Sequence, residues 1–90
     1  MAILHVFSSF QSFQRGRNVL AELTADDSVL LRADALYQLL SETGFASGSY
    51  AVAADALARG LDPAQFPHIE WIDYDDWVEL VMQHQSSIDW

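Results

Sequence analysis

The sequence predicts an α/β domain in which about four mainly parallel strands alternate with flanking helices. Three observations lead to this prediction. Short apolar runs recur along the chain, segments with apolar residues at helical spacing separate them, and aspartates or glycines stand at several of the boundaries. Strands that alternate with helices in this way form βαβ units, which assemble into parallel sheets. We expect residues 1–90 to form one domain, since a chain of this length has room for one core.

Two strands and two helices are expected in the first half of the chain. The apolar run AILHVF at residues 2–7 predicts a buried strand. Apolar residues at roughly helical spacing over residues 11–23 predict a helix, in which Gly16 weakens the first turn. Residues 28–32, SVLLR, predict the second strand, and Asp34 then stands at the N-cap position of the next helix.

Glycines bound the elements that are expected in the middle of the chain. Gly44 is placed to end the second helix, and the GFASG segment that it begins matches neither a nucleophile elbow nor a phosphate-binding loop, so we interpret it as a turn. A third strand is expected over residues 50–54. Asp55 is then expected to cap a brief helix over residues 56–59, which Gly60 ends.

The last helix is the clearest element of the sequence. Residues 69–72 predict a fourth strand, and Asp73 follows them at an N-cap position. Apolar residues at helical spacing are expected to form the inner face of this helix: Tyr74, Trp77, Val78 and Val81.

Clustered carboxylates and three histidines are the candidates for catalytic or metal chemistry. Oxygen-rich clusters bind hard cations or provide acid/base pairs, and four carboxylates lie close together in this chain: Asp73, Asp75, Asp76 and Glu79. Their position favours a structural interpretation, because acidic groups in a first helical turn offset the helix dipole and Asp73 with Asp76 has capping-box spacing. His5, His68 and His84 lack the spacing of zinc ligands. We therefore predict no catalytic residue, no metal and no cofactor.

The composition excludes thiol chemistry and argues against nucleic-acid binding. None of the 90 residues is a cysteine, so the chain itself has no disulfide, thiolate ligand, thiol nucleophile or persulfide carrier. The 13 acidic residues oppose four arginines, which leaves a formal charge of −9. Because nonspecific affinity for nucleic acids comes from Lys and Arg, we expect no direct binding of RNA or DNA. Neither a signal peptide nor a membrane span is recognisable, and we expect a cytoplasmic protein.

Two residues are candidates for a partner interface. Asp34 follows a predicted strand, and open α/β sheets place their ligand crevices beyond the carboxyl ends of the strands. Trp90 is hard to bury at the end of the chain, and tryptophan is enriched where protein surfaces meet. A chain of this size buries a modest fraction of its surface, which favours association with other subunits.

The C-terminal segment resembles the end of the TusB proteins, the DsrH-type subunits of the sulfur relay. The likeness follows the order of the family along the whole chain. The stretches that carry it are ILH at residues 3–5, VLL at residues 29–31 with Asp34 after it, ARGL at residues 58–61, IDYDDWV at residues 72–78, His84 and Trp90. This resemblance implies a small Rossmann-like domain of the DsrE type.

The resemblance also implies a function and a set of partners. Proteins of this type join TusC-like and TusD-like subunits in a heterohexamer, a dimer of trimers, which relays persulfide sulfur to a TusE-like acceptor. The relay supports 2-thiolation of the wobble uridine in transfer RNA, within 5-methylaminomethyl-2-thiouridine synthesis. Some DsrH-type proteins carry a cysteine in the first helix, whereas the corresponding residues 18–21 here have none. A thiol-free chain of this kind is expected to be a noncatalytic subunit.

Alternatives from other classes remain open on the sequence. One is a sulfur-oxidation subunit of the DsrEFH type, which the missing cysteine disfavours. Another is a free-standing homo-oligomer that binds a small ligand at the strand ends near Asp34. A hydrolase that uses the carboxylates of residues 73–79 is disfavoured by their capping positions.

Overall fold

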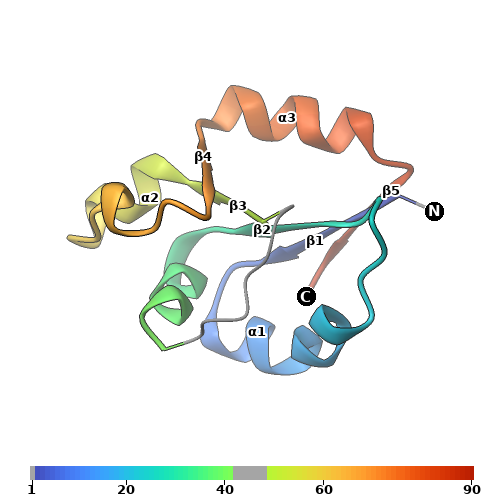
Figure 1. Ribbon diagram of the computed structural model, residues 1–90, viewed down its shortest axis with the longest axis horizontal. Coiled ribbons are helices and arrows are strands. Elements are labelled where there is room, and N and C mark those ends of the chain that lie inside the picture. Colours follow the sequence, from blue (N-terminus) through green and yellow to red (C-terminus); the bar gives the residue numbers. More distant parts are fainter. Residues whose placement is uncertain (1, 42–48) are drawn as a thin grey trace.

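The computed structural model describes residues 2–41 and 49–90. Five parallel strands form one sheet with the order β4-β3-β2-β1-β5 (Figure 1). The strands are β1 (Ile3–Phe7), β2 (Ser28–Leu31), β3 (Ser49–Val52), β4 (Glu70–Ile72) and β5 (Ser86–Asp89). The predicted α/β class is therefore confirmed, with one strand more than the sequence indicated. The helix end predicted at Gly44 and the GFASG turn lie outside the described residues.

Helices cover the two faces of the sheet unequally. The α-helices are α1 (Phe10–Gly16), α2 (Ala53–Ala58) and α3 (Tyr74–Gln83), and the 3-10 segments are η1 (Arg17–Ala21), η2 (Ala33–Leu40) and η3 (Pro63–Gln65). In Figure 1, α3 lies across one face of the sheet, and α1 lies on the opposite face. Residues of α1, η2 and α2 belong to one buried cluster, while α3 contributes Leu80 to the other. Among the described elements, α3 is thus the one helix on its face.

The alternation of side chains along the strands divides the core into two layers. In β1, Leu4 and Val6 face α3, and Phe7 faces α1. The layer beneath α3 is the smaller, and its buried members are Leu4, Val6, Leu30, Val52, Ile72 and Leu80. The layer on the other face contains the aromatic pair Phe7 and Phe13, whose ring centroids lie 5.5 Å apart. Sheets that are parallel throughout are normally buried on both faces, so the thin cover of the α3 face is a notable feature of this fold.

Two helix starts differ from the sequence prediction because residues other than the expected aspartates occupy the N-cap positions. The N-cap of η2 is Arg32, which makes no side-chain cap bond, and Asp34 lies inside the first turn. Helix α2 begins at Ala53, which places Asp55 in its first turn as well. The predicted caps at Asp34 and Asp55 are therefore wrong, since both carboxylates are engaged elsewhere, as described below.

The first helix and the end of α2 follow local rules. Helix α1 begins one residue before the predicted start, with the hydroxyl of Ser9 accepting a hydrogen bond from Ser12 N (3.0 Å), and the chain continues as 3-10 helix after Gly16. Gly60, predicted to end α2, has a positive φ of 72°. Its N–H donates to Leu57 O (3.2 Å), which satisfies a carbonyl at the helix end.

The last helix confirms its predicted cap and corrects its predicted inner face. Asp73 accepts a hydrogen bond from Asp76 N (2.8 Å), and Asp76 accepts one from Asp73 N (3.4 Å), which completes a capping box. Leu80 is the buried residue of α3, and Trp77 is half-buried beside it. Three residues assigned to the inner face are instead exposed: Tyr74, Val78 and Val81. Apolar spacing identifies an apolar face of a helix, but the seating of the helix on the sheet decides which part of that face is buried.

Strand β5 was not predicted because its sequence, SSID, has no apolar periodicity. All four residues are exposed, and the strand is recognised by its parallel pairing with β1, from Ile3 with Ser86 to Val6 with Asp89. A short edge strand whose side chains are exposed carries little compositional signal.

Candidate functional site

Asp34 lies just beyond the carboxyl end of β2, as predicted, where its carboxylate forms an ion pair. The distance from Asp34 Oδ1 to Arg59 Nε is 3.0 Å, and the Asp34 side chain is 67% exposed. Arg59 also donates from Nη1 to the main-chain oxygen of Asp55 (3.1 Å). The Asp34 carboxylate is therefore held against α2. Its role in a partner interface stays a prediction.

Asp55 joins three elements at this edge of the sheet, a role that the sequence analysis missed. Its carboxylate accepts hydrogen bonds from Ala33 N (2.8 Å), at the start of η2, and from the hydroxyl of Tyr74 (2.5 Å), on α3. Ala33 has a φ of 51°, in the left-handed region that costs an alanine about 1 kcal/mol. The bond from its N–H to Asp55 helps to hold that conformation. The sequence contains one indication of this role. Asp55 and Tyr74 each closely follow a strand, and the carboxyl ends of parallel strands lie at the same edge of a sheet.

The charges around Asp55 favour its ionised form. Burial raises the pKa of Asp55. The hydrogen bonds from Tyr74 and Ala33 and the charges of Arg59 and Arg32 together lower it by more, so the net pKa lies below the usual value. The same hydrogen bond to Asp55 raises the pKa of the Tyr74 hydroxyl. An ionised acceptor bonded to a protonated donor ties elements together, and neither group is poised to exchange a proton near neutral pH.

The indole of Trp90 packs inside its own chain. Its ring stacks on Phe7 (centroids 6.4 Å apart, planes at 10°), and its Nε1 donates to Nδ1 of His5 (3.1 Å). The main-chain oxygen of Trp90 accepts a hydrogen bond from Arg15. A Cβ on Gly16 would lie 2.7 Å from the indole, so the absence of a side chain there makes room for the ring. The ring is half-buried against the larger core layer, and its contact with a partner stays a prediction.

An apolar strip runs along the outer side of α3. We define it as Trp77 together with the exposed residues Tyr74, Val78, Val81 and Met82. Val78 is 60% exposed and Met82 is 80% exposed. Trp77, Val78 and Val81 line an apolar hollow of about 230 Å³. The guanidinium of Arg32 lies 5.1 Å from the centre of the Trp77 ring, a cation–π contact that helps to hold this ring in place.

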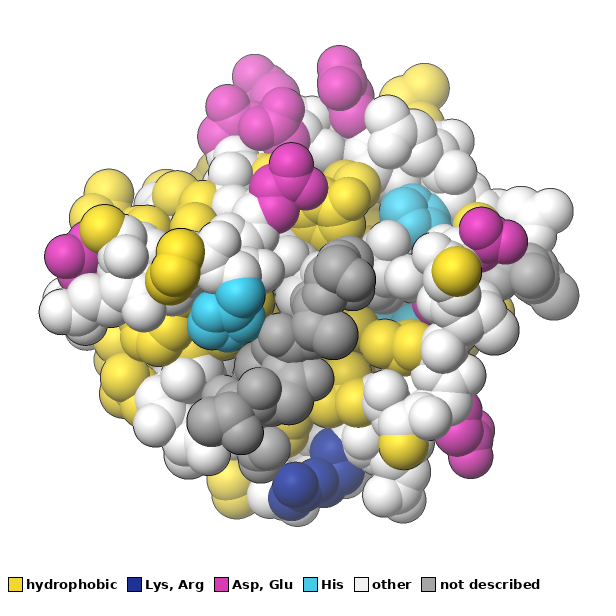
Figure 2. All heavy atoms as spheres, viewed as in Figure 1, with side chains coloured by type: hydrophobic (Ala, Val, Ile, Leu, Met, Phe, Trp, Pro, Cys, Tyr) yellow, Lys and Arg dark blue, Asp and Glu magenta, His cyan; other side chains and the backbone are white. Residues whose placement is uncertain are grey.

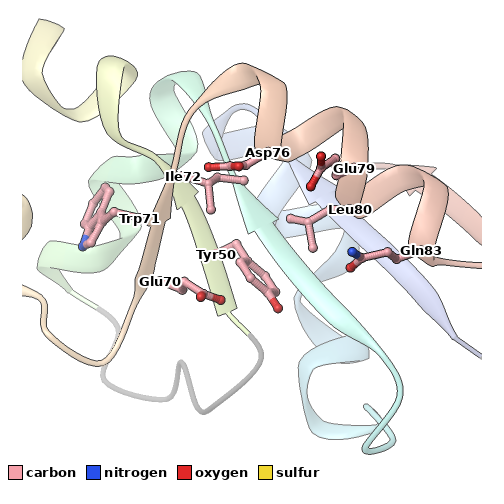
Figure 3. A pocket seen from close by; sticks show the side chains of 8 residues that line it. All are labelled: Tyr50, Glu70, Trp71, Ile72, Asp76, Glu79, Leu80 and Gln83. Atoms are coloured by element: carbon pink, nitrogen blue, oxygen red, sulfur yellow. The ribbon is translucent and has the colours of Figure 1, made fainter.

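An acidic groove of about 290 Å³ lies between α3 and the edge strand β4 (Figure 3). It contains the carboxylates of Glu70, Asp76 and Glu79. Burial and the neighbouring Glu70 raise the pKa of Tyr50, which also lines the groove. Within residues 2–41 and 49–90, no three His, Cys, Asp or Glu side chains are grouped so that they could hold a metal ion. In Figure 2, acidic side chains gather along the edge of the molecule where α3 lies.

The three histidines lie in separate environments. His5 is buried in β1, and His68 is exposed in the segment before β4. His84, at the end of α3, donates from Nδ1 to Leu80 O (2.6 Å), and its Nε2 lies 3.0 Å from Ser28 Oγ. Each of the two inner histidines thus has a structural hydrogen bond.

Comparison with known proteins identifies the family. The model of the DsrH-like protein family matches residues 8–87, nearly the whole chain. The chain belongs to the DsrH-like family. Its membership implies a role in sulfur relay of the TusB/DsrH kind, as the resemblance indicated. A comparison with curated proteins found no significant match.

The fold of this DsrH-like chain is shared with a solved structure. The solution NMR structure of protein Tm0979 from Thermotoga maritima superposes with a TM-score of 0.65, covering 91% of this chain and 92% of that one. The two sequences are 22% identical, so the likeness concerns the fold. No helix in the described part of the DsrH-like chain is long and apolar enough to cross a membrane.

Proposed function

We propose that this DsrH-like chain is a noncatalytic subunit of a cytoplasmic sulfur-relay complex that supports 2-thiolation of the wobble uridine in transfer RNA. The observation that carries the proposal is the family match over residues 8–87 in a chain without cysteine. A persulfide is carried on a thiolate, so the sulfur-carrying residue must belong to another subunit. The role left to this chain is to hold that subunit in place.

The proposed partners are a TusC-like and a TusD-like subunit, assembled with this chain as a dimer of trimers, and a TusE-like protein that accepts the sulfur. Two features support assembly with other subunits. The chain has 90 residues, and one face of its sheet is covered by a single described helix with an exposed apolar strip. Contiguous exposed apolar surface marks sites of protein association.

Copurification followed by mass spectrometry tests the proposal. The tagged chain, expressed in its own host, is expected to bring down two α/β proteins of similar size, one of which contains the reactive cysteine. After incubation with a persulfide donor, the added sulfur should appear on that partner and not on this chain. Recovery of a homo-oligomer alone would instead support the ligand-binding alternative.

Deletion of the gene distinguishes transfer-RNA thiolation from sulfur oxidation. The proposal predicts loss of the 2-thio group from the wobble uridine, measured by nucleoside mass spectrometry, with recovery when the wild-type chain is supplied. Intact thiolation together with impaired sulfur oxidation would assign the chain to a complex of the DsrEFH type.

A further inference from the structure

The exposed apolar side chains of this molecule are concentrated on α3. Among the described residues, nine large apolar side chains are exposed, and four of them are on this helix: Tyr74, Val78, Val81 and Met82. The other five are spread over four elements: Phe10, Tyr37, Leu40, Leu57 and Ile88. Scattered apolar side chains are normal on a protein surface, whereas a continuous row along one helix is typical of a contact surface.

The spacing of α3 places an acidic row directly beside this strip. At 100° per residue, Met82 is followed around the helix by Asp75 and then by Glu79, which borders the groove against β4. All three are exposed. The surface of α3 therefore has an apolar centre with negative charge along one border. Figure 3 shows Glu79 and Asp76 on the groove side of the helix.

We propose that the strip on α3 is the docking surface for another protein subunit, one whose contact surface has an apolar centre and Lys or Arg side chains along one border. The inference rests on the proposed function, in which this chain works by holding other subunits. The hollow lined by Trp77, Val78 and Val81 accepts an apolar side chain of that subunit. Its basic side chains face Asp75 and Glu79, where opposite charges guide association and fix the register.

The charge distribution selects a different protein as the occupant in preference to a second copy of this chain. A two-fold contact sets the same patch of both copies face to face. Each copy would bring its own acidic row into that contact, and the two rows would meet directly where the copies of α3 run antiparallel, on chains that each carry a formal charge of −9. Like charges that meet across an interface are unfavourable.

Substitution of two strip residues by glutamine tests the apolar part of the inference. Val78→Gln with Met82→Gln replaces exposed apolar side chains, so the melting temperature of the isolated chain should stay near the wild-type value. The matched control is Leu40→Gln with Leu57→Gln, because both leucines are similarly exposed, at 64% and 68%, on the other side of the sheet. Each variant is coexpressed with the TusC-like and TusD-like subunits of the host. The strip variant should weaken assembly about tenfold or more, as interface anchors do, and the control should not.

Charge reversal tests the acidic border independently. Asp75→Lys with Glu79→Lys should slow association with the same subunits and change its salt dependence, and Glu22→Lys, an exposed reversal beyond η1 on the opposite side, should not. Asp76 is left intact because it belongs to the capping box.

The outcomes separate this inference from the proposed function. Failure of the wild-type chain to assemble with those subunits would overturn the proposed function. A wild-type complex that tolerates both the glutamine pair and the lysine pair would overturn the docking surface alone. Light scattering of the isolated chain completes the test, because a homodimer that the glutamine pair disrupts would show that the strip binds a second copy.

Discussion

The hydrogen bond from Trp90 Nε1 to His5 Nδ1 joins two side chains that lie 85 positions apart. It requires an unprotonated Nδ1 on His5, because the indole can only donate. Burial lowers the pKa of His5, while the charge of Asp27 raises it by a smaller amount. The surroundings of His5 thus favour the neutral imidazole that the hydrogen bond requires. This bond is one of the contacts that hold the C-terminal residues against β1, and it depends on the protonation state of His5.

The first prediction concerns pH. Because the pKa of His5 lies below 6.5 in the folded chain, the unfolded chain binds the proton more readily, and stability should fall as pH drops below about 6.5. Melting temperatures between pH 8 and pH 5 measure the effect. The pKa of Asp27 is itself lowered by hydrogen bonds from Thr24 N and Ile3 N, so that carboxyl titrates below this range. His5→Asn should flatten the decline, and His68→Gln, at an exposed position, should leave it unchanged. An unaltered decline in His5→Asn would assign the effect to another group.

The second prediction concerns Trp90, for which the structure changes the expected result. On the sequence alone, Trp90→Ala should leave the isolated chain as stable as wild type. The stacked, half-buried ring implies instead a loss of about 2 to 3 kcal/mol in the free energy of unfolding, somewhat below the cost of deleting a fully buried aromatic residue. Trp90→Phe keeps a ring but removes the bond to His5, and should cost about 1 kcal/mol through that bond. Denaturant titration measures both, and wild-type stability in Trp90→Ala would show that the ring does not support the fold.

At the scale of the element, α3 has three structural roles. Among the described elements it is the helix that covers one face of the sheet. It also connects β4 to β5, and it carries the apolar strip. One buried residue, Leu80, and the half-buried Trp77 attach it to the sheet. With so few packed side chains, the capping box at its start contributes a sizeable share of its stability. The four clustered carboxylates that invited a metal interpretation are divided between this cap and the exposed side of the helix.

The third prediction tests that division. Asp73→Ala removes the cap and should reduce the free energy of unfolding by about 1 kcal/mol, whereas Asp73→Asn should cost less because asparagine also caps helices well. Asp75→Ala is the matched control, since Asp75 lies in the same turn outside the capping box. Thermal and denaturant melts of the isolated chain supply the measurement. Assembly with the partner subunits should survive Asp73→Ala, and its complete loss at normal stability would indicate a functional role for this carboxylate.

At the scale of the whole molecule, charge is distributed unevenly. All four arginines precede residue 60, and seven acidic residues follow it. The acidic end of the sequence forms β4, α3 and β5, and three of its carboxylates line the groove. Figure 2 shows acidic side chains along the edge of the molecule where α3 lies. In the proposed transfer-RNA relay, we therefore expect other components to contact the nucleic acid.

The fourth prediction follows from this charge. The isolated chain should not retard transfer RNA in a gel at moderate salt, because it has only four basic side chains that could displace counterions from the phosphates. The coexpressed complex with the TusE-like acceptor, assayed in parallel, separates the behaviour of this subunit from that of its partners. Tight binding by the chain alone that weakens steeply with salt would reveal a basic site, and Arg15→Gln would then be the first variant to examine.

The sequence by itself determined the alternation of strands and helices, the cap at Asp73, the glycine end of α2 and the absence of a thiol. These properties depend on local periodicity, on single capping residues and on composition, all of which are read without knowing distant contacts. Tertiary structure alone decided that residues 86–89 pair with β1, that Leu80 is the buried residue of α3, and that Trp90 stacks on Phe7. Each of these depends on residues far apart in the chain that meet through strand pairing and helix seating, for which no local pattern carries a signal.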